Sequence, residues 1–197
     1  MLLYDGGTML SNPFLFWMLR WLPAGLASWL GGWLSVHVAR RRMKLRDARA
    51  RANLAILRPD LSQPEREAML TRRWINVGRT LAELANIDRL VNDAHVRVID
   101  KAGYDAVLDG PGPMIAFTCH LGNWDLLAAH IKWSTDRPGL GVYEDPEDPR
   151  IAAQLKKARS SYMGEAIGGE GAARGVLKHL TQKDRATLYI LADDGKL

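Results

Sequence analysis

A histidine and a carboxylate five positions apart, His120 and Asp125, are the two side chains of this sequence best placed to do chemistry together. The apolar run 114–119 is typical of a buried strand, and residues 126–129 continue as a helix. Asp125 would then stand in the first helical turn, where the helix dipole favours its negative charge. A carboxylate held there can fix the tautomer of His120 and leave its other ring nitrogen free to accept a proton. The pair is therefore a candidate general base; the alternative is a structural histidine beside a carboxylate that pairs only with the dipole.

The spacing alone does not select this pair, because two further His–Asp pairs share it. His95 and Asp100 enclose an alternating segment that predicts a strand, on which five residues span roughly 17 Å and end on opposite faces. His179 and Asp184 enclose the predicted end of a helix and a turn, where both are expected to be solvated. Only the first pair combines the spacing with a junction between a strand and a helix.

Two neighbours of the pair have roles of their own to consider. Asn123 can cap the N-terminus of the helix or help to bind a substrate. Cys119, the single cysteine, places a thiol beside His120 and invites a rival mechanism with a thiol nucleophile. Adjacent residues on a strand point to opposite faces, which argues against that mechanism. A single cysteine also excludes an internal disulfide.

Residues 119–125, Cys-His-Leu-Gly-Asn-Trp-Asp, resemble the signature of the bacterial lipid A biosynthesis acyltransferases, which usually read His-Phe-Gly-Asn-Trp-Glu. The resemblance extends from about residue 12 onward, through segments 49–54, 61–66 and 142–159. Asp125 departs from the usual Glu, although the wider glycerolipid acyltransferase superfamily pairs His with Asp at this spacing. A second departure is at the end, where Asp193-Asp194 stands in place of an Asp-Gln pair and the family continues. The chain is therefore expected to be shortened at its C-terminus.

The resemblance implies transfer of a fatty acyl chain to a hydroxyl of a membrane glycolipid such as a lipid A precursor. The donor would be a thioester of acyl carrier protein or coenzyme A, and no metal or other cofactor is implied. His120 would deprotonate the acceptor hydroxyl and Asp125 would orient it, while Asn123 is a candidate substrate-binding residue. Arg159 matches the family's downstream arginine and would steady Asp125 or bind a phosphate; otherwise it is one cation of an exposed helix. Two alternatives stay open: acylation of a lysophospholipid or glycerophosphate, which Asp125 favours, and a non-catalytic, membrane-binding truncated homologue.

The charge and the N-terminal apolar run point to a membrane. The net charge of +5 suits anionic partners such as phospholipid, a phosphorylated sugar or an acidic carrier protein. The partners that the resemblance implies include no nucleic acid. Residues 21–38 contain no Asp, Glu, Lys or Arg, and residues 40–51 follow with seven positive charges and one negative. This order is the reverse of a signal peptide, and the positive-inside rule predicts that the catalytic part lies on the cytoplasmic side. The resemblance implies that the membrane is the bacterial inner membrane.

Four of the seven tryptophans, at positions 17, 21, 29 and 33, lie in or beside this run, as expected at a lipid boundary. Pro23 and three glycines weaken it as a spanning helix, so a helix that crosses the membrane and one that lies on its surface both stay open. A core helix hairpin broken at Pro23 is the third possibility. We expect a membrane-associating helical segment with a basic flank over residues 1–51.

Residues 52–197 are expected to form an α/β domain with a largely parallel sheet and flanking helices, incomplete at its C-terminus. A helix is predicted over 64–85, with Pro64 in its first turn after Ser62. The predicted strands are 96–100, 114–119, 140–143, 166–168 and 187–192, and further helices start near residues 102, 124, 149 and 172. Ligands of such sheets bind beyond the carboxyl ends of the strands, where His120 and Asp193-Asp194 fall. The glycine-rich segment 168–171 is either a phosphate-binding turn or an ordinary turn.

Overall fold

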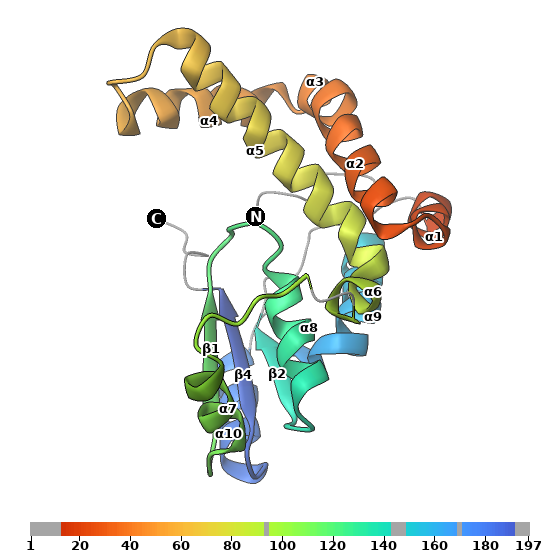
Figure 1. The fold of residues 1–197 in the computed structure, drawn as a ribbon, viewed down its shortest axis with the longest axis vertical. Coiled ribbons are helices and arrows are strands. Elements are labelled where there is room, and N and C mark those ends of the chain that lie inside the picture. The colour runs from red at the N-terminus through yellow and green to blue at the C-terminus, as the bar shows by residue number, and fades with distance from the viewer. Residues whose placement is uncertain (1–12, 93–94, 143–148, 169–170, 192–197) are drawn as a thin grey trace. The chain divides into compact units, whose positions relative to one another are not determined.

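A computed structural model of the chain describes residues 13–92, 95–142, 149–168 and 171–191. Contacts between Cα atoms divide the chain into two compact units, an all-helical unit over Asn12–Ala85 and an α/β unit from Asn86 onward. The expected division after residue 51 falls inside a helix, α4 (Lys44–Leu57). Figure 1 labels the α-helices of both units and three of the four strands, β1, β2 and β4.

The first unit is a succession of helices. They are α1 (Pro13–Trp21), α2 (Ala24–Leu34), a π-helical turn η2 (Ser35–Ala39), α3 (Arg40–Arg42), α4 and α5 (Gln63–Glu83). Helix α5 starts with a capping box, in which the backbone N–H of Ser62 donates to Glu65 Oε2 at 2.8 Å, and has Pro64 in its first turn. The helix predicted over 64–85 is therefore confirmed.

Small residues let α2 pack closely on α5. A Cβ added to Gly78 would collide with the carbonyl oxygen of Gly31 and with the Cβ of Ser35, so only hydrogen fits at this crossing. The buried residues of α2 are Ala27, Ser28, Gly31 and Gly32. Two of the three glycines that weaken the apolar run as a membrane span, Gly31 and Gly32, thus have a role in helix packing.

The apolar run 21–38 is divided between several elements. Helix α1 ends at Trp21 and α2 starts at Ala24, so the chain breaks at Pro23. Within the described residues, no helix has both the length and the apolar character needed to cross a bilayer.

The second unit alternates helices and strands. A 3₁₀ turn η3 (Leu84–Asn86) leads to α6 (Ile87–Asn92), α7 (Lys101–Asp109), β1 (Met114–Thr118), α8 (Asp125–Ser134), β2 (Gly139–Val142), α9 (Pro149–Met163), β3 (Glu165–Ile167), α10 (Ala172–Gln182) and β4 (Thr187–Leu191). Four of the predicted strands and the four later helices are confirmed within a few residues. Tyr143 and Ala192, at the predicted strand ends, lie outside the described residues.

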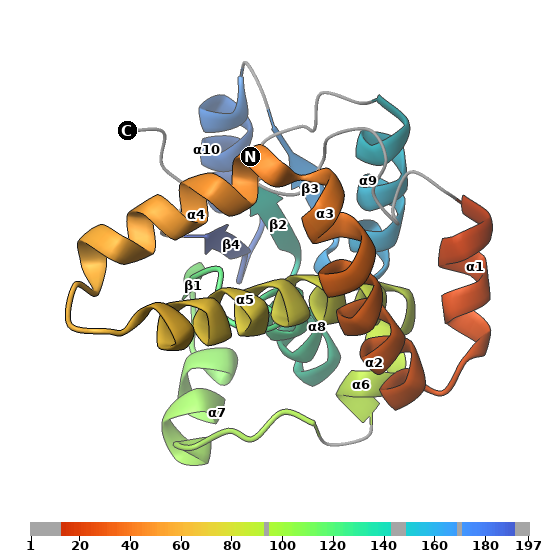
Figure 2. The same cartoon turned by 90° about the horizontal axis from the view of Figure 1, so that it is seen from above.

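The four strands form one parallel sheet in the order β1-β4-β2-β3. The predicted α/β class with a parallel sheet is confirmed. Parallel strands are joined by right-handed crossovers. The crossovers through α8 and α9 run in the same direction along the sheet and the one through α10 runs back. Helices α8 and α9 therefore share one face, where they pack against each other, and α10 covers the other. Figure 2 shows β3 between α9 and α10.

The strand predicted over 96–100 is wrong, because this segment has no regular structure. Instead, the carboxylate of Asp100 accepts a hydrogen bond from the N–H of Gly103 at 2.9 Å and caps the N-terminus of α7. An alternating pattern makes a strand only where a neighbouring strand supplies hydrogen bonds, and the described part of the sheet supplies none here. The argument that His95 and Asp100 lie on opposite faces of a strand therefore fails, although Asp100 has a structural role.

A buried arginine ties the start of the sheet to α7. Arg137 is 3 % exposed, and its Nε donates to the carbonyl of Leu108 at 2.8 Å. Its Nη1 donates to the carbonyls of Gly112 at 2.8 Å and Arg185 at 3.1 Å. These carbonyls belong to the end of α7 and to the turns before β1 and β4. Arg137 thus links the end of α7 to the turns that precede two strands of the sheet and satisfies carbonyl groups there.

Candidate active site

Asp125 is the first residue of α8 and lies immediately beyond the carboxyl end of β1. The connecting loop, 119–124, contains Gly122 with φ 59°, a left-handed conformation that glycine adopts without strain. Asp125 is 2 % exposed, the value of a core side chain. A carboxylate buried to this extent needs a positive partner and hydrogen-bond donors, because burial penalises the charged form.

Helix α9 supplies both. Arg159 Nε donates to Asp125 Oδ1 at 3.0 Å, and Arg159 Nη2 lies 3.4 Å from Oδ2. The hydroxyl of Tyr162 donates to Oδ1 at 2.8 Å. Arg159 and Tyr162 are three residues apart, so they project from the same face of α9 toward the start of α8. The prediction that Arg159 steadies Asp125 agrees with this contact.

The electrostatics of this cluster keep the tyrosine protonated. Burial, with the neighbouring charge of Asp125 as a second cause, raises the pKa of the Tyr162 phenol well above its usual value. The phenol therefore remains a hydrogen-bond donor throughout the pH range in which enzymes work. Arg159 is 8 % exposed and supplies the one positive charge that contacts the carboxylate of Asp125 among the described residues.

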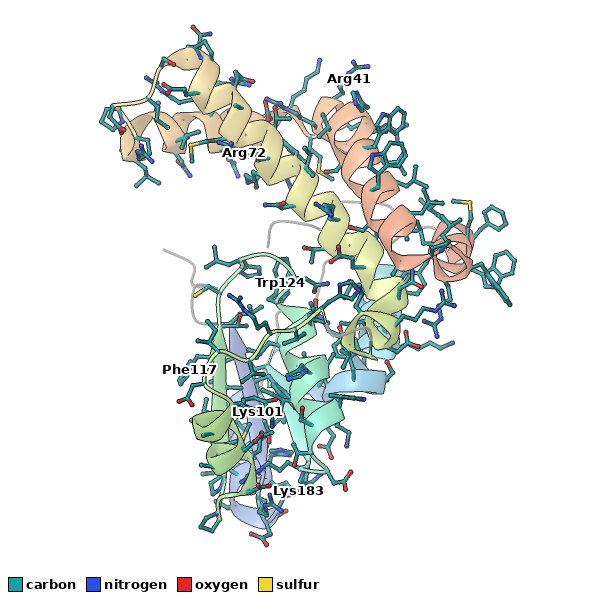
Figure 3. The ribbon with its side chains drawn as sticks, in the orientation of Figure 1. Arg41, Arg72, Lys101, Phe117, Trp124 and Lys183 are labelled. Atoms are coloured by element: carbon teal, nitrogen blue, oxygen red, sulfur yellow. The ribbon has the colours of Figure 1, made fainter. Side chains whose placement is uncertain are left out.

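His120 lies in the loop between β1 and α8, and its side chain is exposed. Its ring contacts the indole of Trp124 edge-on, with the ring centroids 4.6 Å apart and the planes at 69°. Within the described part of the chain, the side-chain hydrogen bonds of Asp125 go to Arg159 and Tyr162, so the bond between Asp125 and His120 stays a prediction. Figure 3 labels Trp124 at the end of the sheet where α8 begins, the end that the strand topology predicts for a ligand.

A small cavity opens beside the carboxylate. Its volume is about 40 Å³, above the ~10–15 Å³ that one water needs. Trp124, Asp125 and Arg159 are among the residues that line it. The remaining lining is mostly apolar and comes from the strands and from α8 and α9, including Ala116, Leu127, Gly141, Met163 and Ile190. The buried polar cluster therefore adjoins a pocket of mostly hydrocarbon walls.

Two details differ from the sequence interpretation. The N-cap position of α8 belongs to Trp124, and Asn123 precedes it, its carbonyl accepting from the N–H of Leu126 at 3.2 Å. Strand β1 ends at Thr118, so Cys119 and His120 follow the strand. The argument from alternating strand faces therefore does not apply to Cys119, whose thiol is half-buried.

The other sequence candidates lie elsewhere. His179 is wrongly predicted to be solvated: it is 3 % exposed, and its Nε2 lies 3.2 Å from the carbonyl oxygen of Pro138. Gly169 and Glu170, at the centre of the proposed phosphate turn, and the pair Asp193-Asp194 lie outside the described residues. Within the described part of the chain, no group of three or more His, Cys, Asp or Glu side chains is arranged to hold a metal ion.

Tyr162 is the site residue that sequence reasoning missed. Its signal was its place three residues after Arg159, which puts the two side chains on one helix face. That signal is usable only once Arg159 is known to point at Asp125, since a tyrosine in an amphipathic helix is ordinarily a packing residue.

Comparison with known proteins agrees with the sequence resemblance. A search of curated proteins found no match. The family model of the bacterial lipid A biosynthesis acyltransferases matches residues 7–195, nearly the whole chain. The chain therefore belongs to the bacterial lipid A biosynthesis acyltransferase family.

Proposed function

We propose that this chain transfers a fatty acyl group from a thioester to a hydroxyl of a membrane glycolipid, with His120 as the general base. The single observation that carries this proposal is the position of Asp125, five residues after His120. Its buried carboxylate accepts hydrogen bonds from Arg159 and Tyr162 at the start of α8. A carboxylate that is fixed in place and next to a histidine can orient the imidazole and stabilise its positive charge.

In this reaction His120 removes the proton from the acceptor hydroxyl as its oxygen attacks the thioester carbonyl. A C–O bond forms, the C–S bond breaks, and the proton passes from His120 to the departing thiolate sulfur. The exposed position of His120 lets both substrates reach it, while Asp125 stays away from water. The side chain of Asp125 is one methylene shorter than the usual Glu. The imidazole of His120 must therefore lie closer to the start of α8 to form a hydrogen bond with its carboxylate.

The donor in this proposal is a thioester of acyl carrier protein or coenzyme A, and the acceptor is a lipid A precursor. A lysophospholipid or glycerophosphate acceptor is the second candidate, because Asp125 matches the wider superfamily. Asn123 would contribute to substrate binding beside His120. No step requires a metal ion or a further cofactor.

Membrane association is part of the proposal and rests on the surface of the first unit. Helices α1 and α2 expose large aromatic side chains, among them Phe14 at 68 %, Trp21 at 70 % and Trp29 at 61 %. The opposite side of α2 is its small-residue face against α5. Exposed aromatic side chains of this kind suit the lipid–water boundary.

Cations follow this aromatic surface in the chain. Arg40 is held by Asp47 and Glu67, whereas Arg41, labelled in Figure 3, is exposed. Exposed cations of α3 and α4 would bind anionic lipid headgroups. We infer that the first unit lies on the cytoplasmic face of the bacterial inner membrane.

The test is an acyl-transfer assay with labelled donor, in which wild type is compared with His120→Ala and Asp125→Ala. Both substitutions should lower turnover by about 10² to 10⁴, the usual cost of removing a general base. Thin-layer separation of the products from lipid A precursor and lysophosphatidic acid identifies the acceptor. Wild-type protein that binds anionic vesicles but transfers no acyl group, with no effect of His120→Ala, would identify a non-catalytic membrane-binding homologue.

A further inference from the structure

The carboxylate oxygens of Asp125 are not used equally. Oδ1 accepts from Arg159 Nε at 3.0 Å and from the Tyr162 hydroxyl at 2.8 Å. Among the residues that the structure describes, Oδ2 has the single, longer contact of 3.4 Å with Arg159 Nη2. A carboxylate offers about four acceptor positions, two on each oxygen. The two short bonds therefore occupy Oδ1 and leave Oδ2 with capacity for a further donor.

Arg159 alone does not fix the orientation of this carboxylate. A bidentate Arg–carboxylate pair makes two parallel bonds of about 2.7–2.9 Å, whereas here the second contact is clearly longer. A guanidinium that makes a short hydrogen bond with only one carboxylate oxygen allows the carboxylate to rotate about its Cβ–Cγ bond. The hydroxyl of Tyr162 reaches the same oxygen from a second direction and opposes that rotation.

We propose that Tyr162 is a positioning residue for acyl transfer: it acts with Arg159 to hold Oδ1 of Asp125 and keep Oδ2 for the imidazole of His120. This inference rests on the proposed function, because it assigns a role to the same carboxylate. Tyr162 touches neither substrate in this scheme, and its effect on the reaction passes entirely through Asp125.

The placement of Tyr162 makes it a dependable donor. It is 6 % exposed and comes from the same helix as Arg159, so both groups reach Asp125 on one rigid element. Because its phenol remains protonated, it never presents a second negative charge to the carboxylate. Loss of this one hydroxyl would leave the charge pair intact and remove only the second direction of restraint.

The test is a double-mutant cycle of Tyr162→Phe with Asp125→Asn, measured as kcat and KM for donor and acceptor. Tyr162→Phe alone should lower kcat about ten-fold, the lower end of the loss seen when a group that orients a functional ligand is removed. KM should stay at the wild-type value for both substrates. In the Asp125→Asn background, Tyr162→Phe should change kcat less than about two-fold, because coupled residues are not additive. Tyr104→Phe removes a phenol hydroxyl from α7, outside the site, and should leave kcat unchanged.

Each outcome separates the two proposals. Wild-type kcat in Tyr162→Phe beside an inactive Asp125→Asn overturns the role of Tyr162 and leaves the proposed function standing. An equal drop of kcat in both backgrounds, or a rise of KM alone, also overturns it, because Tyr162 would then act elsewhere. Full transfer by both His120→Ala and Asp125→Asn overturns the proposed function, and the role of Tyr162 with it. Thermal unfolding of every variant, followed by circular dichroism, distinguishes a lost restraint from a lost fold.

Discussion

Replacement of Arg159 by methionine tests whether the buried cluster is held together by charge. Methionine keeps most of the length of arginine and removes the guanidinium, which leaves the carboxylate of Asp125 buried without a positive partner. The Asp125 side chain is 1 % exposed and that of Arg159 is 10 % exposed, so bulk solvent has little access to the unpaired carboxylate apart from the small cavity of about 40 Å³ beside it. Breaking one side of a buried ion pair typically costs about 3–5 kcal/mol of unfolding free energy.

Two features of the cluster set where in that range the result should fall. The hydroxyl of Tyr162 remains as one donor to Oδ1, which moderates the loss. Both bonds from Arg159, at 3.0 and 3.4 Å, disappear together. We therefore expect a loss of about 3 kcal/mol, measured by urea unfolding with the far-ultraviolet signal of the folded chain.

Two further variants make the result decisive. Lys156→Met changes an exposed cation on the same helix and should cost less than about 0.5 kcal/mol. Asp125→Asn combined with Arg159→Met removes both charges and should recover a large part of the loss. A loss below about 1 kcal/mol for Arg159→Met, or no recovery in the double variant, would refute the reasoning, because the carboxylate would then be stabilised by other groups.

Three further predictions concern the rest of the molecule. Cys119→Ser should leave acyl transfer nearly unchanged; loss of labelled product from a normally folded variant would instead support the thiol mechanism. Gly78→Ala should lower the unfolding free energy by about 1–3 kcal/mol, because the added methyl group collides with α2. A thermal unfolding curve that matches the wild type would show that α2 and α5 can move apart without cost. Desolvation acts to raise the pKa of Asp47, but hydrogen bonds from Trp74, Arg40 and Arg51 outweigh it and lower the pKa. The stability that Asp47 contributes is therefore present at neutral pH and is lost as the pH falls through this lowered pKa. Asp47→Asn should weaken the dependence of the unfolding free energy on pH below about 4. The same pH dependence in the variant and the wild type would contradict this.

Most of the second unit could be predicted from the sequence because its signals are local. The apolar run before His120 and the helical spacing after it place β1 and α8, and the alternation of such runs predicts a parallel sheet. The capping box of Ser62 with Glu65, together with Pro64 in the first turn, likewise marks the start of α5. The segment 96–100 alternates apolar and polar residues, the pattern of a half-buried strand, and yet forms none, because a strand also needs a neighbouring strand to supply its hydrogen bonds.

The environment of His179 and the packing of the first unit could not be predicted in this way. The histidine is buried because α10 packs over β2 and β4 and brings it to the carbonyl of Pro138, 41 residues earlier in the chain. In the same way, nothing in the sequence distinguishes Gly31 and Gly78 from other glycines, and the close packing at these two positions exists only where the two helices cross.

The sequence by itself determined that His120 and Asp125 stand at the junction of a strand and a helix, since that depends on residue types within about a dozen positions. Only the tertiary structure decided what holds Asp125. Its partners, Arg159 and Tyr162, are 34 and 37 residues away and reach it because two right-handed crossovers place α8 and α9 on the same face of the sheet. A buried carboxylate must be compensated by whatever the fold brings beside it, and which residues those are is a property of the packed chain.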